Sequence, residues 1–343
     1  MKNFLIIRMS SLGDVILSTP VPQTIKEEIP DAFVCWLVEE RNASILKNIP
    51  YIDGLVVSTK SIKGILRAII ELRKRKWDIC LDLQSLFKSA LFAFLSGARK
   101  KLGLEKVERG AHIFYDYCVP NIPFSHAVEN NLLATYVAID SLKRKPINIE
   151  QNILKVKKDG RNIRPRIYLT DEEKRRAEKM LNIKKPIVVL CPGTTWDSKK
   201  WFPERWAKVG DALIEDGFEV IFIGGKEDVS HIRNIISYMN HNPIDLAGKT
   251  NIREASAVLQ KSQLAISVDS GAMHMASAVG TPVIALFGPT NPEIQGPYGE
   301  KNEVLYKKLP CSPCRRRLCP HKECMKLITA EEVIEKARLK LSI

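Results

Sequence analysis

Short runs of apolar, often β-branched residues alternate with helical patterns along most of this 343-residue chain. In the first half, strands are predicted over residues 3–8, 33–38, 54–58 and 78–83. Helices are predicted between and after them, near 14–28, 41–48, 62–75, 85–96 and 127–142. This alternation is typical of βαβ units, in which helices cover both faces of a parallel sheet. The first half is therefore predicted to be a doubly wound α/β domain.

The same alternation begins again after a polar, basic segment at 143–165, which we interpret as an interdomain linker. Further strands are predicted over 166–169, 187–192, 219–224, 264–269 and 282–288. Thr170 is predicted to cap a helix with acids in its first turn, and 329–341 to form a last amphipathic helix. We predict two Rossmann-like domains, 1–164 and 165–343. They are expected to face a central cleft, because open α/β sheets bind ligands beyond the carboxyl ends of their strands.

The formal net charge of +14 indicates a polyanionic partner: nucleic acid, an anionic membrane surface or a phosphorylated substrate. Basic residues cluster at 72–77, 97–101, 143–145 and 314–317, although each cluster alone is equally typical of a solvated helix face. No apolar run approaches the roughly 20 residues that a membrane-spanning helix needs. Arg8 and Asp14 interrupt the apolar N-terminal stretch, which argues against a signal peptide. A cytoplasmic location is therefore the expectation.

Segment 264–292 combines a strand, a tight turn and a helix. The strand is predicted to end at Asp269, and Ser270 and Gly271 open a helix that contains His274. Backbone N–H groups at the start of such a helix favour an anion, and Gly271 permits close backbone approach. An ordinary strand-to-helix turn capped by an acid or a serine accounts for the same residues. The pattern thus indicates a phosphate site, with the structural alternative open.

Segment 191–209 predicts a second anion site. A predicted strand runs into a loop with two hydroxyls, Thr194 and Thr195, and two lysines, Lys199 and Lys200. Hydroxyls and a lysine at the carboxyl end of a strand suit a pyrophosphate whose charge grows as it departs. The spacing of glycine, lysine and hydroxyl differs from that of a Walker loop.

Two acids also follow predicted strands. Glu227, after two glycines, is placed either to accept hydrogen bonds from ribose hydroxyls or to cap a helix. Asp14 is predicted at the start of a helix, where the macrodipole lowers its pKa and keeps it ionised. It is either a plain first-turn acid or a base that faces the cleft. Since the loops with phosphate-type donors lie in the second half, we favour the base.

Four of the eight cysteines, Cys311, Cys314, Cys319 and Cys324, crowd into one short segment. The first pair has the spacing of a metal knuckle, and His321 is an alternative ligand. The segment lacks the separation of about 12–20 residues between pairs that zinc modules show, so a metal site is the less favoured interpretation.

Four segments carry a family resemblance, and they occur in the family's order: SSLGDVILSTPV (10–21), DLQSLFKSA (82–90), PGTTWDSKKWFPERW (192–206) and DSGAMHMASAVGTPVIALFGPTNP (269–292). By these segments the chain resembles the ADP-heptose:lipopolysaccharide heptosyltransferases of glycosyltransferase family 9, which have the GT-B fold. The resemblance implies an inverting transfer of L-glycero-D-manno-heptose from ADP-heptose to the lipopolysaccharide inner core. The tail CSPCRRRLCP (311–320) is similar to that of many members called heptosyltransferase II.

The resemblance also implies roles for individual residues. Asp14 would be the general base, and Lys199 would stabilise the leaving diphosphate. The residues on the donor side would be Thr194, Thr195, Lys199, Glu227, Asp269, Ser270, Gly271, Ala272 and His274. The residues on the acceptor side would be Ser10, Ser11 and Gly13, with Lys88, Arg109, Lys100 and Lys101 as further candidates. No cofactor is implied, and ADP-heptose enters as the donor substrate.

The expected partners are ADP-heptose and a lipid A–core acceptor, with the protein a monomer at the inner face of the inner membrane. The basic clusters suit phosphorylated lipid A in an anionic leaflet. The alternatives are heptosyltransferase I, another GT-B sugar-nucleotide transferase, or a nucleic-acid-binding protein with a cysteine metal knuckle. The sequence disfavours the last, because its basic clusters lack interleaved aromatic residues.

Overall fold

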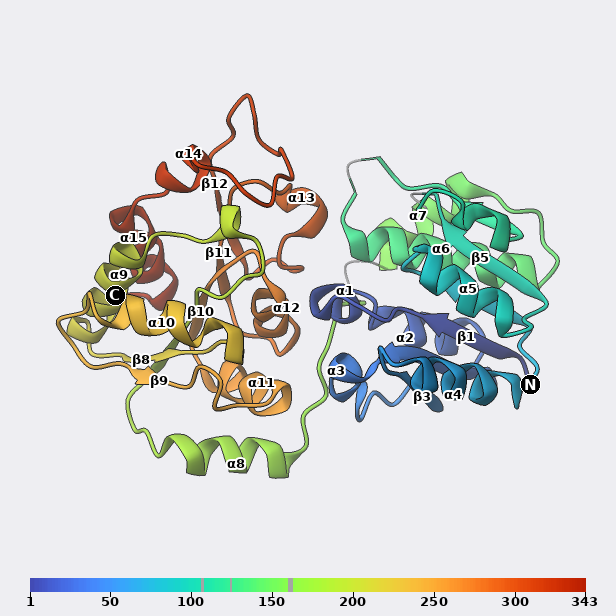
Figure 1. Cartoon of the computed structure of the whole chain (residues 1–343), viewed down its shortest axis with the longest axis horizontal. Helices are drawn as coiled ribbons and strands as arrows, with labels where there is room; N and C mark the ends of the chain where they lie inside the picture. The colour runs from blue at the N-terminus through green and yellow to red at the C-terminus, as the bar shows by residue number, and fades with distance from the viewer. Residues whose placement is uncertain (106–107, 124, 160–162) are drawn as a thin grey trace. The chain divides into compact units, whose positions relative to one another are not determined.

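The chain forms two compact units, Met1–Arg166 and Ile167–Ile343, each built on one sheet (Figure 1). The computed structural model describes residues 1–105, 108–123, 125–159 and 163–343. Within these residues, each unit contains a six-stranded sheet in which every neighbouring pair of strands is parallel. The prediction of a doubly wound α/β fold in both halves is confirmed.

The sheet of the first unit has the strand order β3-β2-β1-β4-β5-β6. Its strands are β1 (Asn3–Ile7), β2 (Phe33–Glu39), β3 (Gly54–Ser58), β4 (Ile79–Asp82), β5 (Lys100–Leu104) and β6 (Tyr117–Val119). Its helices are α1 (Leu12–Leu17), α2 (Pro20–Glu28), α3 (Glu40–Ala43), α4 (Ile62–Arg73), α5 (Phe87–Leu95), α6 (Ala127–Leu142) and α7 (Ile149–Asp159), with 3₁₀ turns η1 (Ser44–Leu46) and η2 (Ala111–Phe114).

Helices cover both faces of this sheet, which is why its central strands are buried on both sides. One face packs against α4 and α5, whose Leu72 and Phe92 join Leu5 and Leu37 of the strands in a single apolar cluster. Helix α6 crosses β4 and β5 on the opposite face, with α2 and α7 beside it. No helix among the described residues is long and apolar enough to cross a membrane.

The sheet of the second unit has the strand order β12-β11-β10-β7-β8-β9. Its strands are β7 (Ile187–Cys191), β8 (Glu219–Phe222), β9 (Ile244–Asp245), β10 (Leu264–Val268), β11 (Val283–Phe287) and β12 (Glu303–Tyr306). Its helices are α8 (Asp171–Leu181), α9 (Pro203–Glu215), α10 (Val229–Ile236), α11 (Ile252–Lys261), α12 (Gly271–Ala278), α13 (Pro292–Gln295), α14 (Glu323–Lys326) and α15 (Ala330–Leu341), with 3₁₀ turns η3 (Asp197–Lys199) and η4 (Lys226–Asp228).

Helices α9, α10 and α15 bury their apolar sides in one cluster with the strands, around Trp206, Val209 and Val333. Helices α11 and α12 pack against each other, and α12 also contacts β10 and β11. Every residue of β7, β10 and β11 is buried. Helices on both faces therefore enclose the centre of this sheet as well.

Both sheets reverse their strand order at one point, between β1 and β4 in the first unit and between β7 and β10 in the second. At such a point the loops that follow the two strands turn in opposite directions and leave a crevice at the carboxyl ends. Ligands of open α/β sheets bind there, so the loops after β1, β4, β7 and β10 are the places to search for a functional site.

Several predicted elements differ from the structure. The helix predicted over 14–28 is two helices, because Pro20 and Pro22 lack the N–H groups that a continuous helix needs. The linker predicted over 143–165 contains α7, in which Asn152 bonds Asp140 of α6 (2.8 Å) and Val156 is buried. Helix α7 is polar and basic overall, because only a narrow side of it is covered.

The strand predicted over 166–169 is wrong. Among the described residues this segment pairs with neither sheet. Isolated hydrogen bonds hold it instead: the Ile167 N–H donates to Ala278 O, and Arg253 donates to Tyr168 O. The sequence did not indicate β5, β6, β9 or β12, which are short or begin with charged residues. Neighbouring strands, rather than an apolar run of their own, specify these four.

Glu173 links the start of α8 to α11 and provides a stability prediction. Its carboxylate accepts from Arg253 at 2.8 and 2.6 Å, and Arg253 is 6% exposed. These hydrogen bonds lower the pKa of Glu173 from an ordinary 4.5 to about 2. We expect Glu173→Gln to lower the free energy of unfolding by about 2 kcal/mol at neutral pH, because it removes one partner of a buried ion pair.

The pH dependence of this effect has a definite sign. Because the folded pKa lies below the unfolded one, the stabilisation is complete above about pH 4.5 and is lost as the pH falls toward about 2. Urea unfolding of both proteins across this range measures the difference. Glu172→Gln is the matched control, since Glu172 pairs with Arg176 on the surface and should change stability by less than about 0.5 kcal/mol. An equal loss in both variants would contradict the expectation.

Candidate functional site

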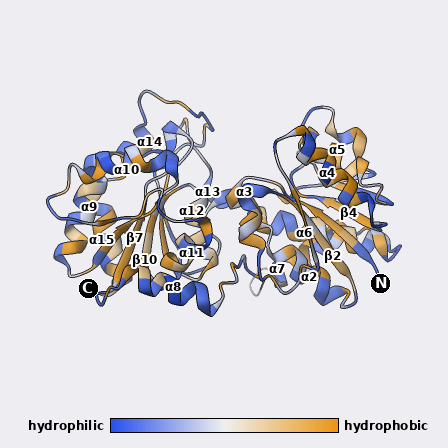
Figure 2. Ribbon diagram, turned by 60° about the horizontal axis from the view of Figure 1, so that its bottom comes forward, coloured by the Kyte–Doolittle hydropathy of each residue, from blue (hydrophilic) through white to orange (hydrophobic). Residues whose placement is uncertain are grey.

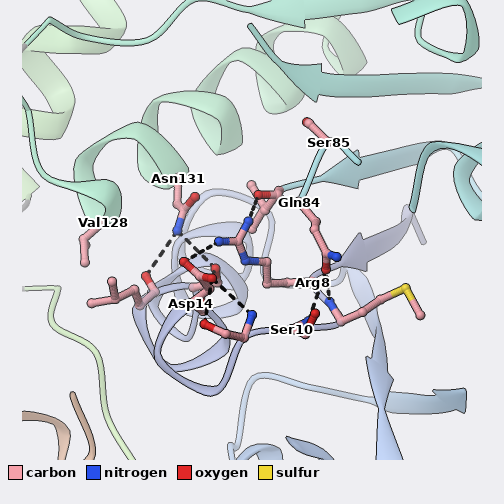
Figure 3. Close-up of polar contacts among 12 residues, drawn as sticks. Arg8, Ser10, Asp14, Gln84, Ser85, Val128 and Asn131 are labelled. Carbon is pink, nitrogen blue, oxygen red and sulfur yellow. Dashed lines mark hydrogen bonds and ion pairs between the residues drawn. The ribbon is translucent and has the colours of Figure 1, made fainter. Parts of the chain in front are cut away.

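In the first unit, an ion pair lies at the carboxyl end of β1 (Figure 3). The guanidinium of Arg8, directly after β1, contacts Asp14 Oδ1 of α1 at 2.7 Å. The other oxygen, Oδ2, accepts from the backbone N–H (3.1 Å) and the hydroxyl (2.9 Å) of Ser11, the residue that precedes α1. Strand, turn and helix thus hold one carboxylate in a fixed orientation.

The pKa of Asp14 lies below its ordinary value. Burial alone would raise it, but the charge of Arg8 and the two hydrogen bonds from Ser11 outweigh that effect. Asp14 is therefore ionised at neutral pH, as the sequence predicted, although an ion pair and hydrogen bonds, rather than the helix dipole, are the identified causes. Its side chain keeps 29% of its surface exposed, so the carboxylate is accessible to a substrate.

The loop after β4 completes this site across the strand-order reversal. Arg8 also donates to the Leu83 carbonyl, and the backbone N–H groups of Met9 and Ser10 donate to Gln84 Oε1 at 2.8 and 3.1 Å. Asp82, buried at the end of β4, accepts from Gln84 N and anchors that loop. Burial raises the pKa of Asp82, partly offset by a 2.7 Å hydrogen bond from Tyr115.

The other residues predicted on the acceptor side lie on several elements of the first unit. Gly13 is buried in the first turn of α1. Lys88, on α5, contacts Glu39 at the end of β2 at 3.4 Å. Arg109 is exposed in the turn before η2, and Lys100 and Lys101 begin β5 at the opposite end of that strand. Of these, the structure brings Ser10, Ser11 and Gly13 to Asp14.

In the second unit, Lys199 and Asp269 meet across the strand-order reversal. Lys199 Nζ, at the end of η3, lies 2.7 Å from Asp269 Oδ2, just after β10, and both side chains are at least 86% buried. The same carboxylate oxygen accepts from the Thr290 hydroxyl at 2.6 Å, and Thr194 donates to the Asp269 carbonyl at 3.3 Å. The loops after β7, β10 and β11 are thereby held together at one edge of the sheet.

An aromatic ring lies beside this lysine. Lys199 Nζ is 4.3 Å from the centre of the Trp196 ring, and the Arg317 guanidinium lies 5.5 Å from the same centre. The 311–324 tail supports this loop, since Ser198 N donates to Arg317 O and Lys322 pairs with Asp197 at 2.8 Å. The tail that carries the cysteines therefore holds in place the loop that carries Lys199.

The remaining donor-side residues lie around the start of α12 and the loop after β8. Ser270 precedes α12 without capping it through its side chain and lies 3.3 Å from the Ser267 hydroxyl. Gly271 and Ala272 form the first turn, and His274 is buried further along the helix. Thr195 and Glu227 are exposed. The neighbouring acid Asp228 is half-buried, and its carboxylate lies against Gly193, where a Cβ would meet it unless the carboxylate shifted.

The four cysteines of the tail are free thiols. Among the described residues, no three His, Cys, Asp or Glu side chains form a group that could hold a metal ion. The metal interpretation of Cys311, Cys314, Cys319 and Cys324 thus gains no support, and the tail's contacts to η3 give the segment a structural role.

Sequence reasoning did not single out Arg8, Gln84, Thr290 or Trp196. Their position in the sequence could have indicated three of them, since Arg8, Gln84 and Thr290 each lie at or just beyond the end of a predicted strand. Arg8 meets Asp14 through the local turn between β1 and α1. The contacts of Gln84 with the 9–10 backbone and of Thr290 with Asp269 depend on which strands are neighbours. The order of the strands in the sheet, which the pattern along the chain leaves open, decides that.

The two doubly wound parallel units belong to the GT-B class of glycosyltransferase folds. A solved glycosyl transferase of family 9 from Veillonella parvula superposes with a TM-score of 0.80 at 22% identity, over 99% of this chain and 97% of the other. The structure of Escherichia coli ADP-heptose heptosyltransferase II gives a TM-score of 0.77 at 21% identity, over 100% and 99%.

Sequence comparison specifies the family. The sequence model of glycosyltransferase family 9 (heptosyltransferase) matches residues 65–325. Lipopolysaccharide heptosyltransferase 3 of Escherichia coli is 30% identical over 94% of this chain and 93% of its own length. Relatives named heptosyltransferase 1 and 2, from Campylobacter coli and Haemophilus influenzae, are 29% and 26% identical over 83% and 88% of this chain. The chain belongs to glycosyltransferase family 9 and is a glycosyltransferase.

Proposed function

We propose that this glycosyltransferase moves L-glycero-D-manno-heptose from ADP-heptose to the inner core of lipopolysaccharide, with inversion at the anomeric carbon. The observation that carries the proposal is the ionised, accessible Asp14, held at the strand-order reversal of the first unit. The lipopolysaccharide heptosyltransferases among its relatives supply the substrate class. That the sites of both units face one cleft stays a prediction.

Asp14 is assigned the role of general base. A hydroxyl oxygen of the acceptor attacks the anomeric carbon from the face opposite the diphosphate, and the hydroxyl proton passes to the Asp14 carboxylate. The new glycosidic C–O bond forms as the bond from carbon to diphosphate oxygen breaks, so the electron pair leaves with ADP. Arg8 and Ser11 hold the carboxylate in one orientation, so that it is ready to take the proton of the incoming hydroxyl.

Lys199 is assigned to the leaving ADP. Its ammonium group, with the Thr194 and Thr195 hydroxyls and the backbone N–H groups that open α12, supplies donors for the charge that develops on the diphosphate. Asp269 carries a negative charge of its own and would repel a phosphate. Its contacts with Lys199 and Thr290 favour a positioning role, in which it holds the lysine ready for the donor.

The remaining parts of the proposal concern the acceptor and the location. The cysteine tail favours heptosyltransferase II, whose acceptor already bears a heptose, over heptosyltransferase I. We propose a monomer at the inner face of the inner membrane, since the net charge of +14 suits phosphorylated lipid in an anionic leaflet. ADP-heptose is the donor substrate, and no cofactor is proposed.

Turnover with defined substrates tests this function. The purified chain is given ADP-heptose with Kdo₂-lipid A or with its heptosylated form, and the product is analysed by mass and by the NMR coupling of the new anomeric proton. We expect transfer to the heptosylated acceptor with inverted configuration. Transfer to Kdo₂-lipid A alone would reassign the chain to type I, and turnover of a UDP-sugar without ADP-heptose would overturn the proposal.

A further inference from the structure

Helix α4 leaves an apolar stripe uncovered on its outer side. Its inner side packs on the sheet through Ala68 and Leu72. Ile62, Leu66 and Ile70, spaced by four residues, lie on the outer side and are 53–78% exposed. Three large aliphatic side chains in one exposed row cost solvation free energy unless a partner covers them.

Helix α5 carries a second stripe beside the first. Phe87, Leu91 and Phe94 recur at helical spacing and are 38–53% exposed. Phe114 of η2 connects the two phenylalanines, with ring centres 5.6 Å from Phe87 and 5.5 Å from Phe94. Both helices pack on the same face of the sheet, and Figure 2 shows α4 and α5 side by side. Both stripes are exposed on the sides of these helices that the sheet does not cover.

Positive charge flanks the α4 side of this apolar surface. Residues 60–76 contain seven lysines and arginines and a single acid, Glu71. Lys63 and Arg67 are exposed on α4 beside the stripe of Ile62, Leu66 and Ile70. A second copy of this chain is disfavoured as the partner, because two such faces would bring like charges together. An anionic surface with an apolar interior complements both features.

We propose that the outer surface of α4, α5 and η2 docks onto an anionic lipid bilayer, with the apolar side chains at the level of the headgroups and the cations on lipid phosphates. Apolar stripes flanked by lysine and arginine are the pattern of helices that lie in a membrane interface. We call this surface, formed by Ile62, Leu66, Ile70, Phe87, Leu91 and Phe94, the α4–α5 surface.

The α5 end of the α4–α5 surface begins next to the loop that supports the candidate acceptor site in the same unit. Helix α5 begins three residues after Gln84, whose side chain holds the backbone next to Arg8, and the Phe87 N–H donates to Glu108 beside it. Docking through this surface would bring a lipid-anchored acceptor to the side of the unit that carries Asp14. This inference deepens the proposed function and rests on it, because the proposed acceptor is anchored in a bilayer.

Flotation with vesicles tests the docking without any donor or acceptor. The full chain is mixed with vesicles of phosphatidylethanolamine and phosphatidylglycerol, or of phosphatidylcholine alone. We expect binding to the anionic vesicles that weakens as salt is raised. Two variants, Ile62→Gln/Leu66→Gln/Ile70→Gln and Lys63→Glu/Arg67→Glu, should each bind at least about tenfold more weakly.

Matched variants on the second unit control for charge and hydrophobicity. Arg175→Glu/Lys179→Glu reverses two exposed cations four residues apart on α8. Met180→Gln/Leu327→Gln/Leu339→Gln removes three exposed apolar side chains. We expect both to bind vesicles within about twofold of wild type. Failure of the wild type to bind, equal losses in the controls, or a dimer that the α4 variants abolish would overturn the inference.

A separate transfer assay distinguishes the two proposals. With a water-soluble, delipidated core oligosaccharide as acceptor, the α4 variants should retain wild-type turnover, because none of the changed residues lies in the Arg8–Asp14 or Lys199–Asp269 pair. Vesicle binding without any heptose transfer would contradict the proposed function and leave the docking surface standing. Heptose transfer without vesicle binding would contradict the docking surface and leave the proposed function standing.

Discussion

Asp14→Asn should lower kcat by about 10²–10⁴-fold, the range that a positioned general base contributes. The amide retains the size of the carboxylate, and its oxygen can still accept from the Ser11 N–H, so the turn before α1 keeps a hydrogen bond. It has no basicity with which to take the acceptor proton. Steady-state transfer from ADP-heptose measures the change, and circular dichroism with a thermal melt verifies the fold.

The pH profile separates a base from a merely structural acid. Since the pKa of Asp14 lies below its ordinary value, the acidic limb of wild-type kcat/KM should lie at lower pH than the titration of an ordinary carboxyl, whose pKa is about 4. Arg8→Met removes the charge that lowers this pKa, so burial dominates and the acidic limb moves to higher pH. Full turnover of Asp14→Asn, or an unmoved limb in Arg8→Met, would remove Asp14 from the role of base.

Lys199→Met should lower kcat by about 10²–10³-fold, comparable with the loss of one preorganised donor to a developing anion. Methionine preserves most of the aliphatic stem beside Trp196 but cannot neutralise the leaving diphosphate. The effect should fall on kcat more than on KM, because the diphosphate gains charge as the sugar leaves. Turnover at varied donor concentration and saturating acceptor measures both kcat and the KM for the donor.

Lys200→Met is the control for Lys199→Met. Lys200 is the next residue and has the same charge, but its ion pair is with Asp197 at 4.0 Å, whereas that of Lys199 is with Asp269 at 2.7 Å. We expect a change of a few-fold at most in kcat. Asp269→Asn tests the positioning role, since it keeps the hydrogen bond of Thr290 and removes the charge that holds Lys199. Equal losses in the Lys199 and Lys200 variants would indicate a general electrostatic effect instead.

The periodicity of the chain predicted the central strands and most helices, because a strand buried on both faces must be continuously apolar. Apart from Asn3 and Ser267, this pattern holds in β1, β7, β10 and β11, and these strands lie within one residue of their predicted ends. Peripheral strands need no such composition. Strand β5 begins with Lys100 and Lys101 at the edge of the core, and the segment 166–169 has no strand partner among the residues that the structure describes.

For the candidate site, the sequence identified the groups and the structure identified their partners. Asp14, Lys199 and Asp269 follow predicted strands and carry charges, which is visible in the chain alone. The pairing of Lys199 with Asp269 could not be predicted from the chain alone. The two residues are separated by 70 positions and meet because β7 and β10 are neighbours. Glu227, predicted to meet the ribose, is exposed, and its role stays a prediction.

By itself the sequence determined the fold class and the loops that carry charged groups, since both depend on local patterns of apolar and polar residues. Only the tertiary structure decided which of these groups act on each other. Arg8 lowers the pKa of Asp14 across the local turn between β1 and α1. Asp269 holds Lys199, and Gln84 holds the 9–10 backbone, because strand order brings distant loops to the same edge of a sheet. The outward direction of the α4 and α5 stripes was likewise decided by which sides of these helices the sheet had already covered.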